Sequence, residues 1–120
     1  MQPRFQCYRR DDRLWWRLLG RNNRSLARSV HGFVDLEAAV ADALSLTVLA
    51  AEVPIELVSE SGTSWRWVLL LDGEPRATST ISYARRLECL RAITRFRASV
   101  ATATVAADPL IVRSRLWTRD

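Results

Sequence analysis

The chain contains no lysine: all 18 of its basic side chains are arginines, and with 13 acidic residues they give a formal net charge of +5. Arginine makes bidentate contacts with phosphate and carboxylate groups, which lysine does not make. An arginine-only basic set therefore fits an anionic partner. A genome whose codon usage favours arginine is the explanation that we weight more heavily, and composition alone does not exclude the other.

Histidine, cysteine and glycine are scarce, and this scarcity excludes several kinds of site. One histidine and two separated cysteines, Cys7 and Cys89, do not supply the ligands of a zinc site. The four glycines are isolated, so there is no glycine-rich phosphate loop. We expect no cofactor and no bound metal. The cysteines are expected to be small buried residues rather than a disulfide, which favours a reducing cytoplasm.

The chain also lacks a long uninterrupted apolar run. Its longest apolar stretch, residues 36–49, contains Glu37 and Asp42 and is too short to span a bilayer. The first ten residues have neither the apolar core nor the cleavage site of a signal peptide. A chain of 120 residues is expected to form one domain with a working hydrophobic core and no contact with a membrane.

What the chain does contain is one pattern of strands and a helix, present twice. Strand-forming residues and polar turns alternate along both halves. The expected strands are residues 5–10, 14–19 and 25–30 in the first half and 55–58, 65–71 and 76–81 in the second. Each half then continues into an expected helix, residues 36–49 with Asp35 as N-cap and residues 85–100.

The two halves align at an offset of 50 residues without a gap. The matched pairs are Phe5 with Ile55, Trp15 with Trp65, Ala27 with Ala77, Ser29 with Ser79 and Phe33 with Tyr83. The turns also align: Asp11-Asp12 with Ser61-Gly62, and Asn22-Asn23, for which a type I′ turn is expected, with Asp72-Gly73. Agreement of strands, turns and helices in one register indicates an internal repeat. Trp16-Arg17 would match Trp65-Arg66 better at an offset of 49, which predicts a bulge or a register change in the second strand.

The pattern predicts an α+β fold in a single domain, residues 1–120. Two β-β-β-α repeats (about 5–50 and 55–100) are expected to join edges into one antiparallel sheet, with both helices packed on one face. The remaining tail, residues 101–120, contains an expected strand at 109–116 that crosses over to the first repeat. The chain is expected to be a monomer with internal pseudo-symmetry or a weak homodimer.

These motifs resemble the YegP-like family of small bacterial and archaeal proteins. The aromatic-Arg-aromatic-x-Leu motif of that family is clear in Trp65-Arg66-Trp67-Val68-Leu69 and blurred in Trp15-Trp16-Arg17-Leu18-Leu19. The resemblance implies tandem β(3)-α-β units that share one sheet and exchange their C-terminal strands. It implies no activity. The chain departs from the family pattern at Arg85, which replaces the usual polar helix cap.

Arginines and tryptophans gather in the first three expected strands and their turns. Because Trp15 and Trp16 are consecutive in a strand, they point to opposite faces, so one of them lies on the open face of the sheet. Trp65 and Trp67 share a face and are expected to be core residues, with an aromatic platform as the alternative. The candidate contact residues for a ligand or nucleic acid are Arg9, Arg13, Trp16, Arg17, Arg21, Arg24 and Arg28. The alternative for these arginines is a solvated basic face that protects the sheet edge.

The sequence favours a non-catalytic binding or interaction module in the cytoplasm, whose partner, a protein or a nucleic acid, is unknown. One alternative is a nucleic-acid-binding protein that uses the arginine-rich open face of the sheet. A further alternative is a hydrolase-type enzyme that uses His31 with Asp35 and either Ser25 or Ser29. A hairpin turn explains the adjacent Asp11 and Asp12 better than a cation site does. We expect that the chain is not an enzyme.

Overall fold

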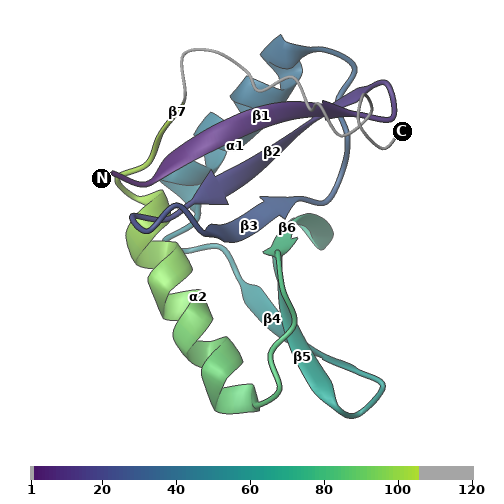
Figure 1. Cartoon of the computed structure of the whole chain (residues 1–120), viewed down its shortest axis with the longest axis vertical. Coiled ribbons are helices and arrows are strands. Elements are labelled where there is room, and N and C mark those ends of the chain that lie inside the picture. Colours follow the sequence, from purple (N-terminus) through teal and green to yellow (C-terminus); the bar gives the residue numbers. More distant parts are fainter. Residues whose placement is uncertain (1, 106–120) are drawn as a thin grey trace.

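The computed structural model describes residues 2–105, which form seven strands and two helices (Figure 1). The first repeat consists of β1 (Arg4–Arg10), β2 (Arg13–Leu19), β3 (Ser25–Ser29) and α1 (Leu36–Leu49). The second consists of β4 (Ile55–Glu60), β5 (Ser64–Leu71), β6 (Glu74–Ser79) and α2 (Arg86–Val100), and β7 (Thr104–Val105) follows it. The predicted order of elements is confirmed, with boundaries that differ by a few residues.

All the strands belong to one sheet, in the order β4-β5-β6-β3-β2-β1-β7. Each repeat is an antiparallel meander, and the two meanders join where β3 pairs antiparallel with β6. At the centre of that junction Arg28 lies opposite Thr78, its counterpart at an offset of 50. The repeats are therefore related by an approximate two-fold axis through this residue pair, and their edges join as predicted.

The last described strand, β7, makes the sheet mixed rather than purely antiparallel. It pairs in parallel with β1, with Arg4 opposite Thr104 and Phe5 opposite Val105. The antiparallel sheet expected for the two repeats is confirmed for their six strands, and β7 adds one parallel pair because α2 returns the chain to the end of the sheet where β1 starts. As the resemblance implied, the segment after the second repeat pairs with the first repeat. The strand expected at residues 109–116 lies outside the described residues.

Both helices pack on one face of the sheet. α1 contacts β1 and β2, whereas α2 contacts β3, β4 and β5. Asp35 caps α1 as predicted: its Oδ1 accepts a hydrogen bond from the backbone N–H of Ala38 over 2.8 Å. Arg85 precedes α2 and makes no side-chain capping bond. Within residues 2–105, neither helix is long and apolar enough to cross a membrane.

The core lies between the sheet and the helices. Its largest fully buried side chains include Trp16, Trp67, Phe5 and Phe96. Phe5 meets Trp16 edge-on at a ring-centroid distance of 5.2 Å, and Trp67 packs on Phe96 at 4.5 Å. Trp65 is partly buried against the same core. The prediction that Trp65 and Trp67 are core residues is therefore confirmed.

The second strands align differently from the sequence prediction: Trp16, and not Trp15, is the counterpart of Trp67. The backbone N–H of Trp16 donates to Ser29 Oγ over 3.2 Å, and that of Trp67 donates to Ser79 Oγ over 3.3 Å. The local offset is thus 51, so the match at 50 and the alternative at 49 are both wrong for this strand. The reason is the first turn: residues 61–63 separate β4 from β5, whereas only residues 11–12 separate β1 from β2.

Left-handed residues mark the tight hairpins. Asp11 and Asp12 have φ angles of 54° and 62°, and Asp72 and Gly73 have 52° and 80°. Two successive positive φ angles define the type I′ turn that suits a two-residue hairpin. The type I′ turn expected at Asn22-Asn23 is wrong. Only Asn23 has a positive φ, and its N–H donates to Gly20 O within a longer connection.

Candidate functional site

Three of the predicted arginines share the open face of the first repeat. Arg13 and Arg17 alternate in β2 with buried Leu14 and Trp16, and Arg28 lies between two buried residues of β3. Because the buried residues face the helices, these arginines point to the opposite side of the sheet. Arg17 lies directly opposite Arg28 in the sheet. The fold therefore brings Arg13, Arg17 and Arg28 onto one surface.

The other candidates lie elsewhere. Arg9 follows Phe5 and Cys7 along the core-facing side of β1, whereas Arg21 and Arg24 are exposed in the β2–β3 connection. Trp16 is wrong as a contact residue, because its side chain is fully buried under α1. Its indole Nε1 donates to Asp42 Oδ2 in that helix over 2.7 Å.

Of the two consecutive tryptophans, Trp15 is the one on the open face, where it lies opposite Tyr8 of β1. The guanidinium of Arg10 stacks 4.8 Å from the centre of the Trp15 ring, and that of Arg17 lies 5.6 Å from the centre of the Tyr8 ring. These distances are within the range of cation–π contacts. The consecutive tryptophans indicated that one would face outward. The register of β2, which the sequence did not settle, decides which one.

Neighbouring groups hold this cluster in place. The Nε and Nη2 atoms of Arg17 donate to Gln6 Oε1 over 2.9 and 2.6 Å. Trp15 Nε1 donates to the backbone carbonyl of Arg10 over 3.1 Å. The Trp15 ring packs on Gly32, where an added Cβ would lie 2.9 Å from it. The surface formed by Tyr8, Arg13, Trp15, Arg17 and Arg28 is called the basic aromatic face below.

A shallow hollow of about 260 Å³ adjoins this face where the two repeats meet. Arg28 of β3 and Arg66 of β5 both line it, together with Val30, Val68, Pro75 and Thr78. Arg66 Nε lies 3.2 Å from Glu60 Oε2, so its charge is already balanced. The positive charge available to a ligand in this hollow therefore comes mainly from Arg28.

The two repeats differ in the charged side chains that their strands and turns carry. The edge strand of the second repeat carries Glu56 and Glu60, and the β5–β6 hairpin carries Asp72 and Glu74. The first repeat presents arginines in the corresponding area. Because Glu60 is paired with Arg66, the difference comes mainly from the unpaired arginines of the first repeat, to which an anionic molecule would be attracted.

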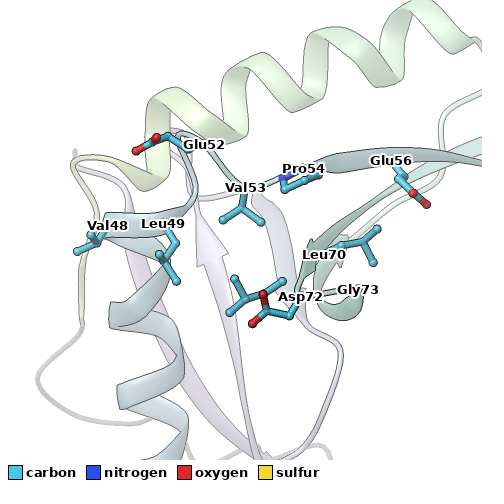
Figure 2. Close-up of a pocket in the computed structure, with 10 residues that line it drawn as sticks. Val48, Leu49, Glu52, Val53, Pro54, Glu56, Leu70, Asp72 and Gly73 are labelled. Carbon is cyan, nitrogen blue, oxygen red and sulfur yellow. The ribbon is translucent and has the colours of Figure 1, made fainter.

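A second hollow, of about 700 Å³, lies at the end of α1 (Figure 2). Its apolar lining includes Leu49, Val53 and Leu70, and Figure 2 shows Val53 pointing from its loop toward the Asp72–Gly73 turn. Glu52 and Glu56 stand at its rim, turned outward. The sequence did not predict this groove, because it forms where residues 48–56 meet residues 70–73, and sequence spacing does not specify that packing. Across residues 2–105, no cluster of three or more His, Cys, Asp or Glu side chains is placed to bind a metal.

The groups proposed for hydrolysis do not come together. His31 is exposed, and no residue from 2 to 105 forms a hydrogen bond or an ion pair with its side chain. Ser29 is buried and accepts the Trp16 N–H, Ser25 Oγ lies 2.7 Å from Thr80 Oγ1, and Asp35 caps α1. The two free thiols are also buried, and burial raises the pKa of both Cys7 and Cys89, which keeps them protonated at neutral pH.

The duplicated meander, with its two helices on one face and its returning C-terminal strand, defines the class of fold seen in the YegP and UPF0339 proteins. The solution structure of yegP from E. coli, described as a protein of unknown function, matches with a TM-score of 0.70 and 17% identity, over 88% of this chain and 91% of that one. A UPF0339 protein from Shewanella oneidensis matches with a TM-score of 0.71 and 13% identity, over 92% and 93%. No protein-family model and no curated protein sequence matches. The resemblance inferred from the sequence motifs is thus confirmed as a likeness of fold.

Proposed function

We propose that this chain is a non-catalytic binding protein of the cytoplasm and that the basic aromatic face is its ligand surface. One observation carries the proposal: none of Arg13, Arg17 and Arg28 forms an ion pair with any residue of the described chain. Each of them is at least partly exposed on the same side of the sheet. Uncompensated positive charge on one rigid surface favours an anionic partner. The buried free thiols support a reducing compartment.

A single-stranded nucleic acid is the partner class that the aromatic residues favour. Nucleic-acid-binding sheets combine arginines that contact phosphates with aromatic rings on which bases stack. Trp15 and Tyr8 supply two rings among the arginines. The Arg10 guanidinium stacks on the Trp15 ring. A base would therefore either displace this guanidinium from the ring or stack on the guanidinium itself. An acidic segment of another protein is the alternative partner, since it needs the arginines but not the rings.

Binding of fluorescently labelled single-stranded oligonucleotides, titrated with salt, tests this proposal. The double variant Arg17→Ser/Arg28→Ser should weaken binding at least tenfold. It should also reduce the slope of log K against log salt by about 0.7 for each phosphate that the protein no longer neutralises. Arg86→Ser/Arg91→Ser is the matched control, because it removes the same charge from exposed positions on α2. The control should weaken binding only about twofold.

Poly-glutamate is the second probe, and it separates the two partner classes. Binding of poly-glutamate that Arg17→Ser/Arg28→Ser abolishes, without binding of oligonucleotides, would support the acidic protein partner. If neither probe binds at low ionic strength, or if the α2 control loses as much affinity as Arg17→Ser/Arg28→Ser, the basic aromatic face is not the ligand surface.

A further inference from the structure

One flank of α1 is apolar, and the described part of the chain leaves it largely uncovered. Leu36, Val40, Leu44 and Val48 are spaced four residues apart and therefore lie along one side of the helix. Leu36, Leu44 and Val48 are 36%, 47% and 76% exposed. Single exposed leucines are ordinary, but a line of them along a helix indicates a contact surface. These four residues are called the α1 flank.

Leu36, Val40 and Leu44 of the α1 flank face away from the second repeat, whereas Val48, at the end of the helix, also lines the groove that α1 forms with that repeat. Asp42 and Ser45 lie on the opposite side of the helix, where both contact the Arg76 guanidinium of β6. The α1 flank is therefore turned toward the sheet edge formed by β1 and β7. In Figure 1, α1 lies behind β1 and β2, and β7 lies at that edge. β7 itself contacts α1.

We propose that the segment 106–117 of the same chain covers the α1 flank. The described chain stops at Val105, in the strand next to this helix, so the segment begins beside the surface in question. The 14 residues of α1 span about 21 Å at about 1.5 Å per residue, a length that about seven extended residues match at about 3.3 Å each. Residues 106–117 are thus long enough to follow the whole flank.

The composition of this segment fits the surface. It contains Leu110, Ile111 and Val112, then Leu116 and Trp117, which would remove the apolar atoms of the α1 flank from water. Arg113 and Arg115 separate the two apolar groups. A segment that runs on in the direction of β1 reaches the first turn of α1, where exposed Glu37 offers an opposite charge. This contact lies on the helix side of the sheet and is independent of the basic aromatic face.

Amide hydrogen exchange of the full chain, read at residues 110–117, tests this proposal. In the wild-type protein these amides should exchange at least tenfold more slowly than in an unstructured peptide of the same sequence. Leu44→Asp should remove that protection. Leu87→Asp should not, and it is the matched control because Leu87 is a leucine of α2 that is 56% exposed. Amides of the β2–β3 ladder, read in parallel, verify that both variants remain folded.

Three outcomes would overturn the proposal. The first is exchange of residues 110–117 at the rate of the unstructured peptide in the wild-type protein. The second is protection that Leu44→Asp leaves unchanged. The third is a dimer mass in light scattering, combined with protection that is lost when the protein is diluted. A second copy of the chain would then cover the α1 flank. Protection in a monomer that Leu44→Asp removes and Leu87→Asp retains supports it.

Discussion

Trp16 and Asp42 form a partly buried hydrogen bond, Nε1 to Oδ2 over 2.7 Å, that joins β2 to α1. The second repeat has no equivalent bond. Ala92 stands in α2 where Asp42 stands in α1, and Trp67 Nε1 is buried without an acceptor among the described residues. Each repeat thus keeps a tryptophan in the core, but only in the first repeat does its Nε1 have an acceptor among the described residues. An unsatisfied buried donor costs free energy, so the second repeat carries a small local penalty.

This asymmetry predicts that replacing the core tryptophan with phenylalanine lowers the free energy of unfolding by different amounts in the two repeats. Trp16→Phe and Trp67→Phe remove similar volumes from fully buried sites, but only Trp16→Phe removes a hydrogen bond. Trp16→Phe should therefore lower the free energy of unfolding by about 1–3 kcal/mol more than Trp67→Phe. Urea unfolding followed by far-UV circular dichroism measures both. Equal losses would show that the Asp42 bond contributes nothing to stability.

Asp42 also links the repeats, because its carboxylate pairs with Arg76 of β6. The Asp42 side chain is 8% exposed and that of Arg76 25%, so the pair is largely withdrawn from water. Asp42→Ala should destabilise the fold by about 3 kcal/mol, since it leaves the partly buried Arg76 guanidinium without its carboxylate and the buried Trp16 Nε1 without its acceptor. Glu88→Ala, at an exposed position of α2, is the control and should cost less than about 1 kcal/mol. A double-mutant cycle with Arg76→Met isolates the pair, and a coupling energy near zero would contradict this prediction.

Gly32 is a glycine whose neighbours leave no room for a side chain. A Cβ at this position would lie 2.8 Å from Arg13 Cβ and 2.9 Å from the Trp15 ring. At Gly20 the nearest atom would be the end of the Leu26 side chain, 3.2 Å away, which can move. Gly32→Ala should therefore cost about 1–3 kcal/mol and Gly20→Ala clearly less, as measured by thermal or urea unfolding. The loss from Gly32→Ala should shrink in a Trp15→Ser background, and an unchanged loss would locate the strain elsewhere.

The buried thiols predict a loss of stability at alkaline pH. Burial raises the pKa of Cys7 and Cys89 above the ordinary value of 9.0, so the unfolded chain loses these protons at a lower pH than the folded one. Their contribution to stability is fully present below pH 9.0 and is lost as pH rises from there through the folded-state pKa. Urea midpoints measured from pH 7 to 10 should fall in the wild type and fall less in Cys7→Ala/Cys89→Ala. Parallel curves for the two proteins would contradict this assignment.

Local signals in the sequence predicted most of the fold. The alternation of strand-forming residues with polar turns predicted the strands, and Asp35 marked the start of α1. The internal repeat predicted that two meanders join into one sheet. The parallel pairing of β7 was missed because a two-residue strand has no pattern of its own and depends on where α2 ends. The register of β2 was missed because one extra residue in the β4–β5 turn shifts the alignment of the next strand.

The candidate site was predicted only in part, for the same reason. A one-residue change of register exchanges the two faces of a strand, so Trp16 was assigned to the surface and Trp15 was overlooked. Arg13, Arg17 and Arg28 meet because β2 and β3 pair, which the meander predicted. The cation–π contacts of Arg10 and the hollow beside Arg28 depend on side-chain positions in several strands, which sequence spacing does not specify.

The central claim is that the basic aromatic face of the first repeat is the ligand surface. Mapping of chemical shifts in ¹H–¹⁵N spectra, on addition of a single-stranded oligonucleotide or of poly-glutamate, tests it most directly. The largest shifts should occur at the amides of Arg13, Arg17 and Arg28 and, for the oligonucleotide, at the Trp15 indole, and they should diminish as salt is added. Absence of shifts with both probes at low ionic strength, or largest shifts in α2 or β4, would contradict the claim.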